Sequence, residues 1–206
     1  MMASIMRCCR NARLFSPLLA RFSKTFLLLL LLFFWSASSH AASSNMHIRN
    51  ADLRLDGEAY NLEADVDIRF DDDVEEAINK GVVLHFVVEF QVVSPRKYWF
   101  DDEIVTKTQK VALSYHALTR QYLLLRDGRQ QSYDTLLEAK LELAEIRDWK
   151  VLEKLQIEKG EPYQAALLMR LDESKLPKAI QVNAIGSEEW ALTSQKYEWV
   201  PKELNK

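Results

Sequence analysis

Cysteine is nearly absent from this 206-residue sequence, which has only Cys8 and Cys9, both before residue 42. The remaining residues therefore cannot form a disulfide bond, a thiolate metal site or a cysteine nucleophile. A domain of roughly 165 residues can bury close to 70% of its unfolded surface. We expect apolar packing alone to hold residues 42–206 together.

Acidic residues are absent before residue 42, where the five charged residues are all basic. Beyond that point 22 basic residues stand against 30 acidic ones, a net charge of −8. Neutralising phosphates requires clustered Lys and Arg, so nucleic-acid binding is not expected. With 48% hydrophobic and 28% charged residues, the composition excludes a collagen-like, wholly disordered or wholly membrane-embedded protein.

One long apolar run, Phe26–Trp35, lies between the basic start and the small residues Ser36–Ala41. This order is typical of a secretory signal peptide. As a helix the run rises about 15 Å, roughly half of a bilayer core. We therefore expect residues 1–41 to be a signal peptide cut after Ala41, with Ala42 as a neighbouring option, and residues 42–206 to be one periplasmic domain.

The alternative is an uncleaved anchor over residues 25–42, with the domain facing the periplasm from the inner membrane. That anchor would be the protein's only membrane contact. It would contain Ser38, Ser39 and His40, which weakens it as a membrane span.

Period-two alternation of apolar and polar residues dominates the rest of the sequence. It is clearest over Tyr60–Phe70, which with the preceding alternation and the Asp56-Gly57 turn predicts a hairpin over residues 47–70. Val82–Val93 is apolar on both faces, as expected of a central strand. Further strands are predicted at Ile104–Tyr115, Thr119–Leu125, Tyr163–Leu171, Ile180–Ile185 and Trp190–Trp199, with a second hairpin turn at Asp127-Gly128.

Two helical segments are predicted. Asp71–Asp73 cap a short turn over Val74–Lys80, and Asp134 caps a longer helix over Thr135–Asp148 whose apolar residues cover a sheet. The resulting fold class is mainly β (α+β). It is an antiparallel β-sandwich or twisted sheet of about eight strands, with one packed helix at about 134–148.

Histidines and carboxylates offer no convergent catalytic or metal-binding arrangement. On a strand His85 and Glu89 would lie about 13 Å apart, too far to share a metal ion. The acidic row Glu63, Asp65 and Asp67 lacks a calcium-loop pattern and is better explained as a solvated face. We expect no catalytic residue, no metal site and no cofactor.

Aromatic and basic residues form a more specific candidate for a functional site. Core and rim packing is the favoured explanation, because aromatic side chains dominate burial in β-proteins. The alternative is a recognition surface, since Trp, Tyr and Arg are enriched in binding hot spots. The candidate binding residues are Trp99, Tyr115, His116, Arg120, Tyr122 and Trp190.

Four segments resemble a family of exported proteobacterial proteins labelled domain of unknown function 4390: Tyr98–Asp101, Leu113–Tyr122, Leu176–Asn183 and Trp190–Trp199. The resemblance covers roughly residues 46–201, and the sequence is more charged than the family pattern around Lys150–Leu155. It implies no activity, cofactor or catalytic residue. Members are often encoded near a nitrogen-regulation-type sensor kinase, so the resemblance implies an envelope sensing role with such a kinase as candidate partner.

Three functions are consistent with these features. The first is a non-catalytic periplasmic module that binds an envelope protein or a small ligand. The second is a structural or assembly factor tethered to the inner membrane by an uncut N-terminal helix. The third, a hydrolase, requires His116 within about 3–4 Å of Asp101 or Asp102, directly or through a water. Ligand, oligomeric state and biological process are not specified by the sequence.

Overall fold

The computed structural model describes residues 45–97, 100–184, 187 and 189–205. These all belong to the second of two units into which the chain divides, Ser43–Lys206. Within the described residues, nine strands form two antiparallel sheets. The predicted mainly β fold is confirmed.

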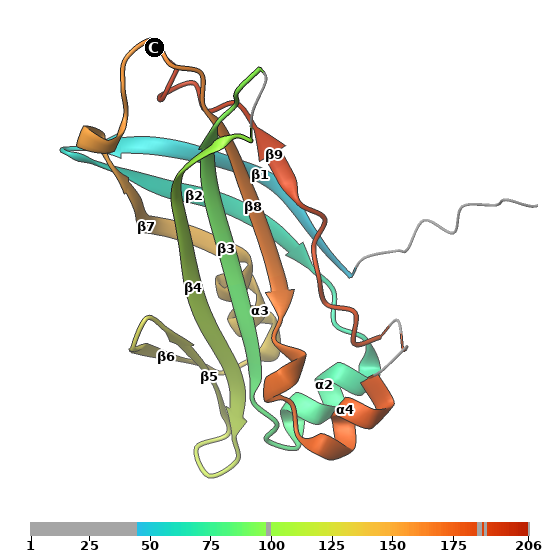
Figure 1. The fold of residues 1–206 in the computed structure, drawn as a ribbon. Helices are drawn as coiled ribbons and strands as arrows, with labels where there is room; N and C mark the ends of the chain where they lie inside the picture. The colour runs from blue at the N-terminus through green and yellow to red at the C-terminus, as the bar shows by residue number, and fades with distance from the viewer. Residues whose placement is uncertain (1–44, 98–99, 185–186, 188, 206) are drawn as a thin grey trace, which may run out of the picture. The chain divides into compact units, whose positions relative to one another are not determined.

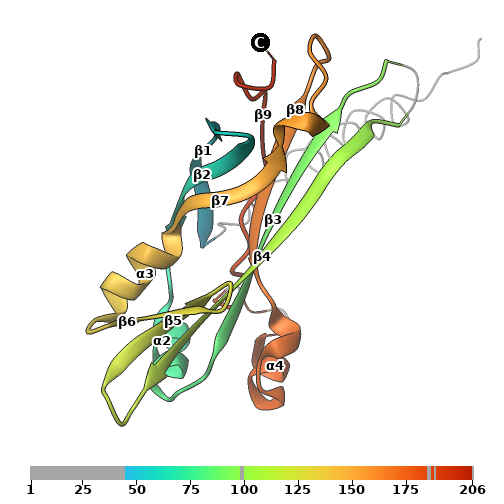
Figure 2. The ribbon, with the colours of Figure 1, turned by 90° about the vertical axis from the view of Figure 1, so that its left-hand side faces the viewer.

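The smaller sheet has the order β1-β2-β7, with β1 at Met46–Asp56, β2 at Ala59–Ile68 and β7 at Glu145–Glu153. The larger has the order β6-β5-β4-β3-β8-β9. Its strands are β3 (Leu84–Ser94), β4 (Asp102–His116), β5 (Gln121–Arg126), β6 (Arg129–Tyr133), β8 (Gln164–Leu171) and β9 (Tyr197–Trp199). Figures 1 and 2 show the smaller sheet against one face of the larger.

The core lies between the two sheets. Five side chains of β3, from Leu84 to Val92, alternate along the strand and are fully buried, as expected of a strand between β4 and β8. The Phe90 ring lies 6.4 Å from that of Trp149 on β7 and 6.2 Å from that of Trp199 on β9. The edge-on contact with Trp149 therefore joins the two layers, whereas the tilted contact with Trp199 lies within the larger sheet.

Both predicted hairpin turns are confirmed. Gly57 between β1 and β2 has φ 59°, and Asp127 and Gly128 between β5 and β6 have φ 48° and 80°. These left-handed conformations match the twist of the flanking strands and favour Gly and Asp.

One of the two predicted helices is confirmed, and the other is shorter than predicted. Helix α2 (Asp72–Asn79) forms as expected, although the Asp71 side chain makes no capping bond. Helix α3 begins at Leu136 with a capping box between Thr135 and Glu138, but it ends at Ala144. The prediction of helix to Asp148 is wrong, because Glu145–Glu153 is strand β7.

The α3–β7 junction is fixed by tertiary contacts. The Arg126 guanidinium of β5 donates hydrogen bonds of 2.8 Å to the carbonyl oxygens of Glu142 and Glu145, which ends the helix. Asp148, with φ 52°, lies at a bulge in the β2–β7 pairing.

The predicted strand Ile180–Ile185 is also wrong. Residues Lys178–Ala184 form helix α4. The carbonyl of Pro177 accepts hydrogen bonds from the amides of Ile180 and Gln181, and proline suits a helix start. The side-chain amide of Gln181 donates through Nε2 to the carbonyls of Glu173, Ser174 and Leu176. Single-turn 3-10 helices occur at Lys154–Gln156 and Glu173–Lys175.

The predicted strand Trp190–Trp199 is shorter than expected. Only Tyr197–Trp199 forms β9, while Thr193 and Ser194 make isolated bridges to β8 and β1. No helix in the described part of the chain is long and apolar enough to cross a membrane. The expected signal peptide or anchor lies outside the described residues.

Candidate functional site

Tyr115 and Tyr122 form a direct cross-strand pair on β4 and β5, with ring centroids 4.9 Å apart. The Tyr122 hydroxyl donates a 2.6 Å hydrogen bond to the Asn79 side chain at the end of α2. Burial, followed by the neighbouring Tyr115 and Glu75, raises the pKa of Tyr122. This pair therefore joins the β4–β5 hairpin to α2 in addition to presenting a partly exposed aromatic surface.

His116 and Arg120 lie at the adjoining β4–β5 turn, and both are exposed. His116 Nδ1 lies 3.0 Å from the Thr119 hydroxyl, and Arg120 has a left-handed backbone with φ 56°. Four of the predicted binding residues are thus brought together at one hairpin end. Their role in binding stays a prediction.

Trp190 is buried, with 5% exposure. It lines a cavity of about 300 Å³ together with residues of α2 and α4, including Ala77 and Ile180, and none of the other predicted binding residues lines that cavity. This placement favours a packing role for Trp190. The remaining predicted residue, Trp99, lies outside the described residues.

The pairing that a hydrolase would need is not formed. His116 ends β4, whereas Asp102 begins it and Asp101 immediately precedes it. Fourteen strand steps separate His116 from Asp102, which corresponds to roughly 46 Å. A proton cannot pass directly, or through one water, over that distance.

The acidic row on β2 is matched by arginines from the neighbouring strands. Arg54 pairs with Glu63 at 3.2 Å, Arg49 pairs with Asp67 at 3.2 Å, and Arg147 pairs with Asp65. All six side chains are at least one-third exposed. These ion pairs account for the row as a solvated face of the smaller sheet.

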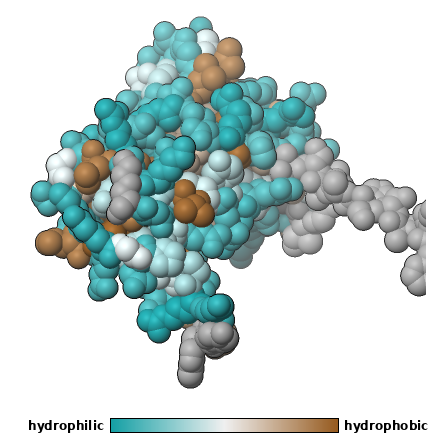
Figure 3. Space-filling model, turned by 90° about the horizontal axis from the view of Figure 1, so that it is seen from above, coloured by the Kyte–Doolittle hydropathy of each residue, from teal (hydrophilic) through white to brown (hydrophobic). Residues whose placement is uncertain are grey.

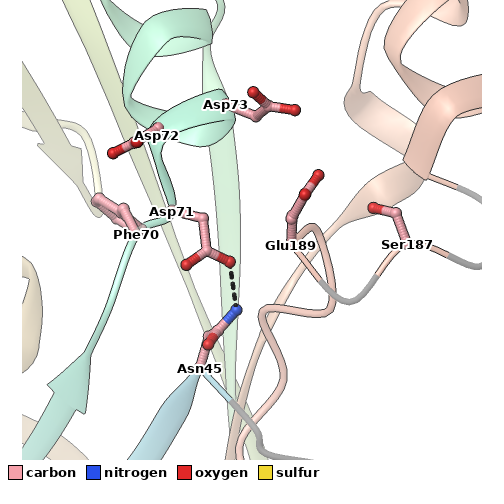
Figure 4. Close-up of a pocket in the computed structure, with 7 residues that line it drawn as sticks. All are labelled: Asn45, Phe70, Asp71, Asp72, Asp73, Ser187 and Glu189. Atoms are coloured by element: carbon pink, nitrogen blue, oxygen red, sulfur yellow. Dashed lines mark hydrogen bonds between the residues drawn. The ribbon is translucent and has the colours of Figure 1, made fainter.

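A second acidic group lines a cavity of about 760 Å³ beside the start of α2 (Figure 4). Asp71, Asp72 and Asp73 project from one side and Glu189 from the other, while the Asn45 side chain donates a 3.0 Å hydrogen bond to Asp71. Repulsion from Asp73 is the largest cause that raises the pKa of Glu189, followed by desolvation. The cavity favours cationic groups electrostatically.

No group of three or more His, Cys, Asp or Glu residues within the described ranges has the arrangement of a metal site. The acidic cavity therefore supplies negative potential without a set of converging ligands. Its sequence signal, three consecutive aspartates, was visible, but the approach of Glu189 from a distant segment was not.

A third site lies between two strand edges. β4, β7 and the 3-10 helix after β7 line a cavity of about 560 Å³ through Val105, Lys107, Lys150, Val151, Leu152, Glu153 and Gln156. β7 is the outer strand of the smaller sheet. β5 pairs only with Val111–His116 of β4, so the preceding part of β4 continues beyond its neighbour (Figure 2). We call this site the β4–β7 groove.

The lengths of two predicted strands already indicate part of this groove. The predicted strand Ile104–Tyr115 is much longer than the predicted strand Thr119–Leu125 that follows it. In an antiparallel hairpin the longer strand must extend past the shorter one. The position of β7 beside that extension could not be predicted, because the sequence pattern predicts a helix, not a strand, over residues 145–148.

Exposed apolar residues are scattered. Leu137 and Leu141 lie one turn apart on α3, whereas Leu118 in the β4–β5 turn and Leu155 in the 3-10 helix Lys154–Gln156 are single residues. Figure 3 shows small separate apolar areas within a largely hydrophilic surface on the face it presents. Scattered apolar residues of this kind are normal for protein surfaces and do not by themselves mark an interface.

A family model described as Domain of unknown function (DUF4390) matches residues 43–200. No curated protein and no solved structure matches the chain.

Proposed function

The chain belongs to the family described as domain of unknown function (DUF4390), and on that premise we propose that it is a non-catalytic binding module of the cell envelope. It is exported to the periplasm and engages another protein. Export is supported by the basic start, the short apolar run and the small residues before Ala42.

The observation that carries the binding role is the β4–β7 groove. Two strand edges of different sheets face one cavity, which half-buried Val105 and exposed Lys107 and Lys150 line, while Val151 and Leu152 beneath it are fully buried. A non-obligate protein interface is about as polar as the rest of a protein surface, so this mixed lining suits one. The separation of His116 from Asp102 along β4 supports binding over the hydrolase alternative.

Position-specific cross-linking in living cells tests this proposal. A photoreactive amino acid replaces Gln156, which is exposed and lines the groove, or Lys178, which is exposed on α4. We expect one defined protein adduct from the Gln156 position and none from Lys178. The sensor kinase implied by the family resemblance is the first candidate to probe for. Equal or absent adducts at both positions would contradict the proposal.

Processing is tested separately by sequencing the N-terminus of the protein that the cell accumulates. A start at Ala42 or Ser43 supports a free periplasmic module. An intact N-terminus in the membrane fraction favours the tethered structural or assembly factor. Intact protein in the cytosol would overturn export.

A further inference from the structure

Part of β4 has an unpaired edge. β3 pairs with β4 from Asp102 to Leu113, whereas β5 pairs only with Val111–His116. In the described part of the chain, nothing pairs with residues 103–110 on their other side. An edge of this length presents a row of backbone donors and acceptors that can accept another strand.

The edge lies beside a cavity that can receive side chains. Val105 and Lys107 point to the same face of β4, since successive side chains alternate, and both line the β4–β7 groove. On the opposite side Val151 and Leu152 of β7 are already fully buried, so an added side chain would contact exposed Lys150 and Gln156 there. A strand added to β4 would direct every second side chain into this groove.

The charged side chains near the edge indicate which kind of segment would bind there. Lys107 is exposed and shares the groove face of β4 with Val105, whereas Lys110 points to the opposite face. Lys150, across the groove, is already paired with Glu153 at 3.1 Å. The charged side chains that line the groove, Lys107, Lys150 and Glu153, therefore sum to +1 in a domain whose net charge is −8, and this lining is complementary to an acidic segment.

We propose that residues 103–110 of β4 bind an extended, acidic segment of a partner protein as an added β-strand. This inference rests on the proposed function and specifies its partner chemistry. Backbone hydrogen bonds supply affinity, while Lys107 selects a carboxylate on the side of the segment that faces the groove. Eight residues of edge span about 26 Å, which a segment of similar length covers.

The test uses fluorescent peptides of about ten residues and the protein in the form that the cell accumulates. One peptide alternates Thr and Glu, a second alternates Thr and Lys, and a third is the Thr–Glu peptide with two central prolines, which lack the amide hydrogen needed for pairing. Fluorescence anisotropy measures binding at low and physiological salt. We expect the Thr–Glu peptide to bind at least about tenfold more tightly than either other peptide.

Variants locate the binding. Lys107→Glu is expected to weaken the Thr–Glu peptide about tenfold, because attraction becomes repulsion. Lys178→Glu makes the same charge change on α4 and should leave affinity unchanged. Amide exchange within residues 103–110 should slow when the peptide is bound.

Three results would overturn the inference: no binding of the Thr–Glu peptide, equal binding of its proline variant, or no effect of Lys107→Glu. A dimer of the free protein that Lys107→Glu dissociates would also overturn it, by showing that a second copy occupies the edge. If cross-links at Gln156 persist while the Thr–Glu peptide does not bind, the proposed function is supported and strand addition is contradicted.

Discussion

Arg126 offers the sharpest test of the contacts that shape this fold. Its guanidinium reaches from β5 to two carbonyl oxygens at the end of α3, at 2.8 Å each. Arg126→Met keeps most of the apolar stem and removes both hydrogen bonds. The last carbonyls of the helix would then lose a cationic partner at the negative end of the helix dipole.

The expected loss of stability is the difference between the gain from these hydrogen bonds and the cost of burying the guanidinium. A hydrogen bond to a charged group contributes about 1.5–3 kcal/mol. Burial lowers the pKa of Arg126, and its Nε is buried without a hydrogen-bond partner among the described residues, so desolvation offsets part of that gain. We expect a net loss of about 2 kcal/mol. With a urea slope of about 2 kcal/mol per molar, the unfolding midpoint would fall by about 1 M.

Urea unfolding followed by circular dichroism measures this loss. Arg126→Lys keeps the charge, but one ammonium replaces the planar fork that bridges both carbonyls, so it should lose about half as much. Arg129→Met, which removes an exposed arginine across the same hairpin, should change stability by less than about 0.5 kcal/mol. If Arg126→Met behaved like Arg129→Met, the capping explanation of the α3–β7 junction would be refuted.

Three further substitutions test the acidic cavity, the tyrosine contact and the core. Glu189→Gln should raise the melting temperature at neutral pH, because Asp73 repels the Glu189 carboxylate and holds its pKa above the ordinary 4.5. The stability of the wild-type protein falls as the pH rises through the range in which Glu189 loses its proton. The gain from the substitution should therefore vanish in acid, where Glu189 is protonated. Tyr122→Phe loses the hydrogen bond to Asn79 and should cost about 1 kcal/mol in urea unfolding. Phe90→Ala empties the space between the two sheets and should cost about 3–5 kcal/mol, measured in the same way.

Each of these has an informative contrary result. A gain from Glu189→Gln that is equal at neutral and acid pH would show that repulsion is not its cause. Tyr133→Phe is the comparison for Tyr122→Phe, since the Tyr133 hydroxyl bonds exposed Gln131 of its own strand and also interacts with Glu142; an equal cost for both substitutions would mean that the bond to Asn79 adds nothing particular. A cost below about 1 kcal/mol for Phe90→Ala would mean that the layers repack without this ring.

Strands with strict alternation were predicted well because their burial pattern is local. The β1–β2 hairpin and the central strand β3 form where expected, and both hairpin turns carry the residues that left-handed backbone favours. The errors occur where apolar residues suit either structure. Ile180 and Val182 alternate as in a strand, yet Val182 is 72% exposed on α4.

The candidate site was predicted less well, since a site depends on residues far apart in the chain. The hairpin holding Tyr115, His116, Arg120 and Tyr122 could be predicted because these residues are close in sequence. The place of Trp190 beside α2 and α4, and the approach of Glu189 to Asp73, depend on how the C-terminal segment returns to the first half of the domain.

The sequence by itself determined a mainly β domain without cysteine, preceded by a basic segment with one long apolar run, because composition and side-chain periodicity are properties of neighbouring residues. Only the tertiary structure decided that residues 145–153 form a strand beside β2 and that β4 extends past β5 to face it. Helix and strand differ little in local preference at such positions. The hydrogen bonds and buried area offered by distant segments, here Arg126 and the edge of β2, are large enough to decide between them.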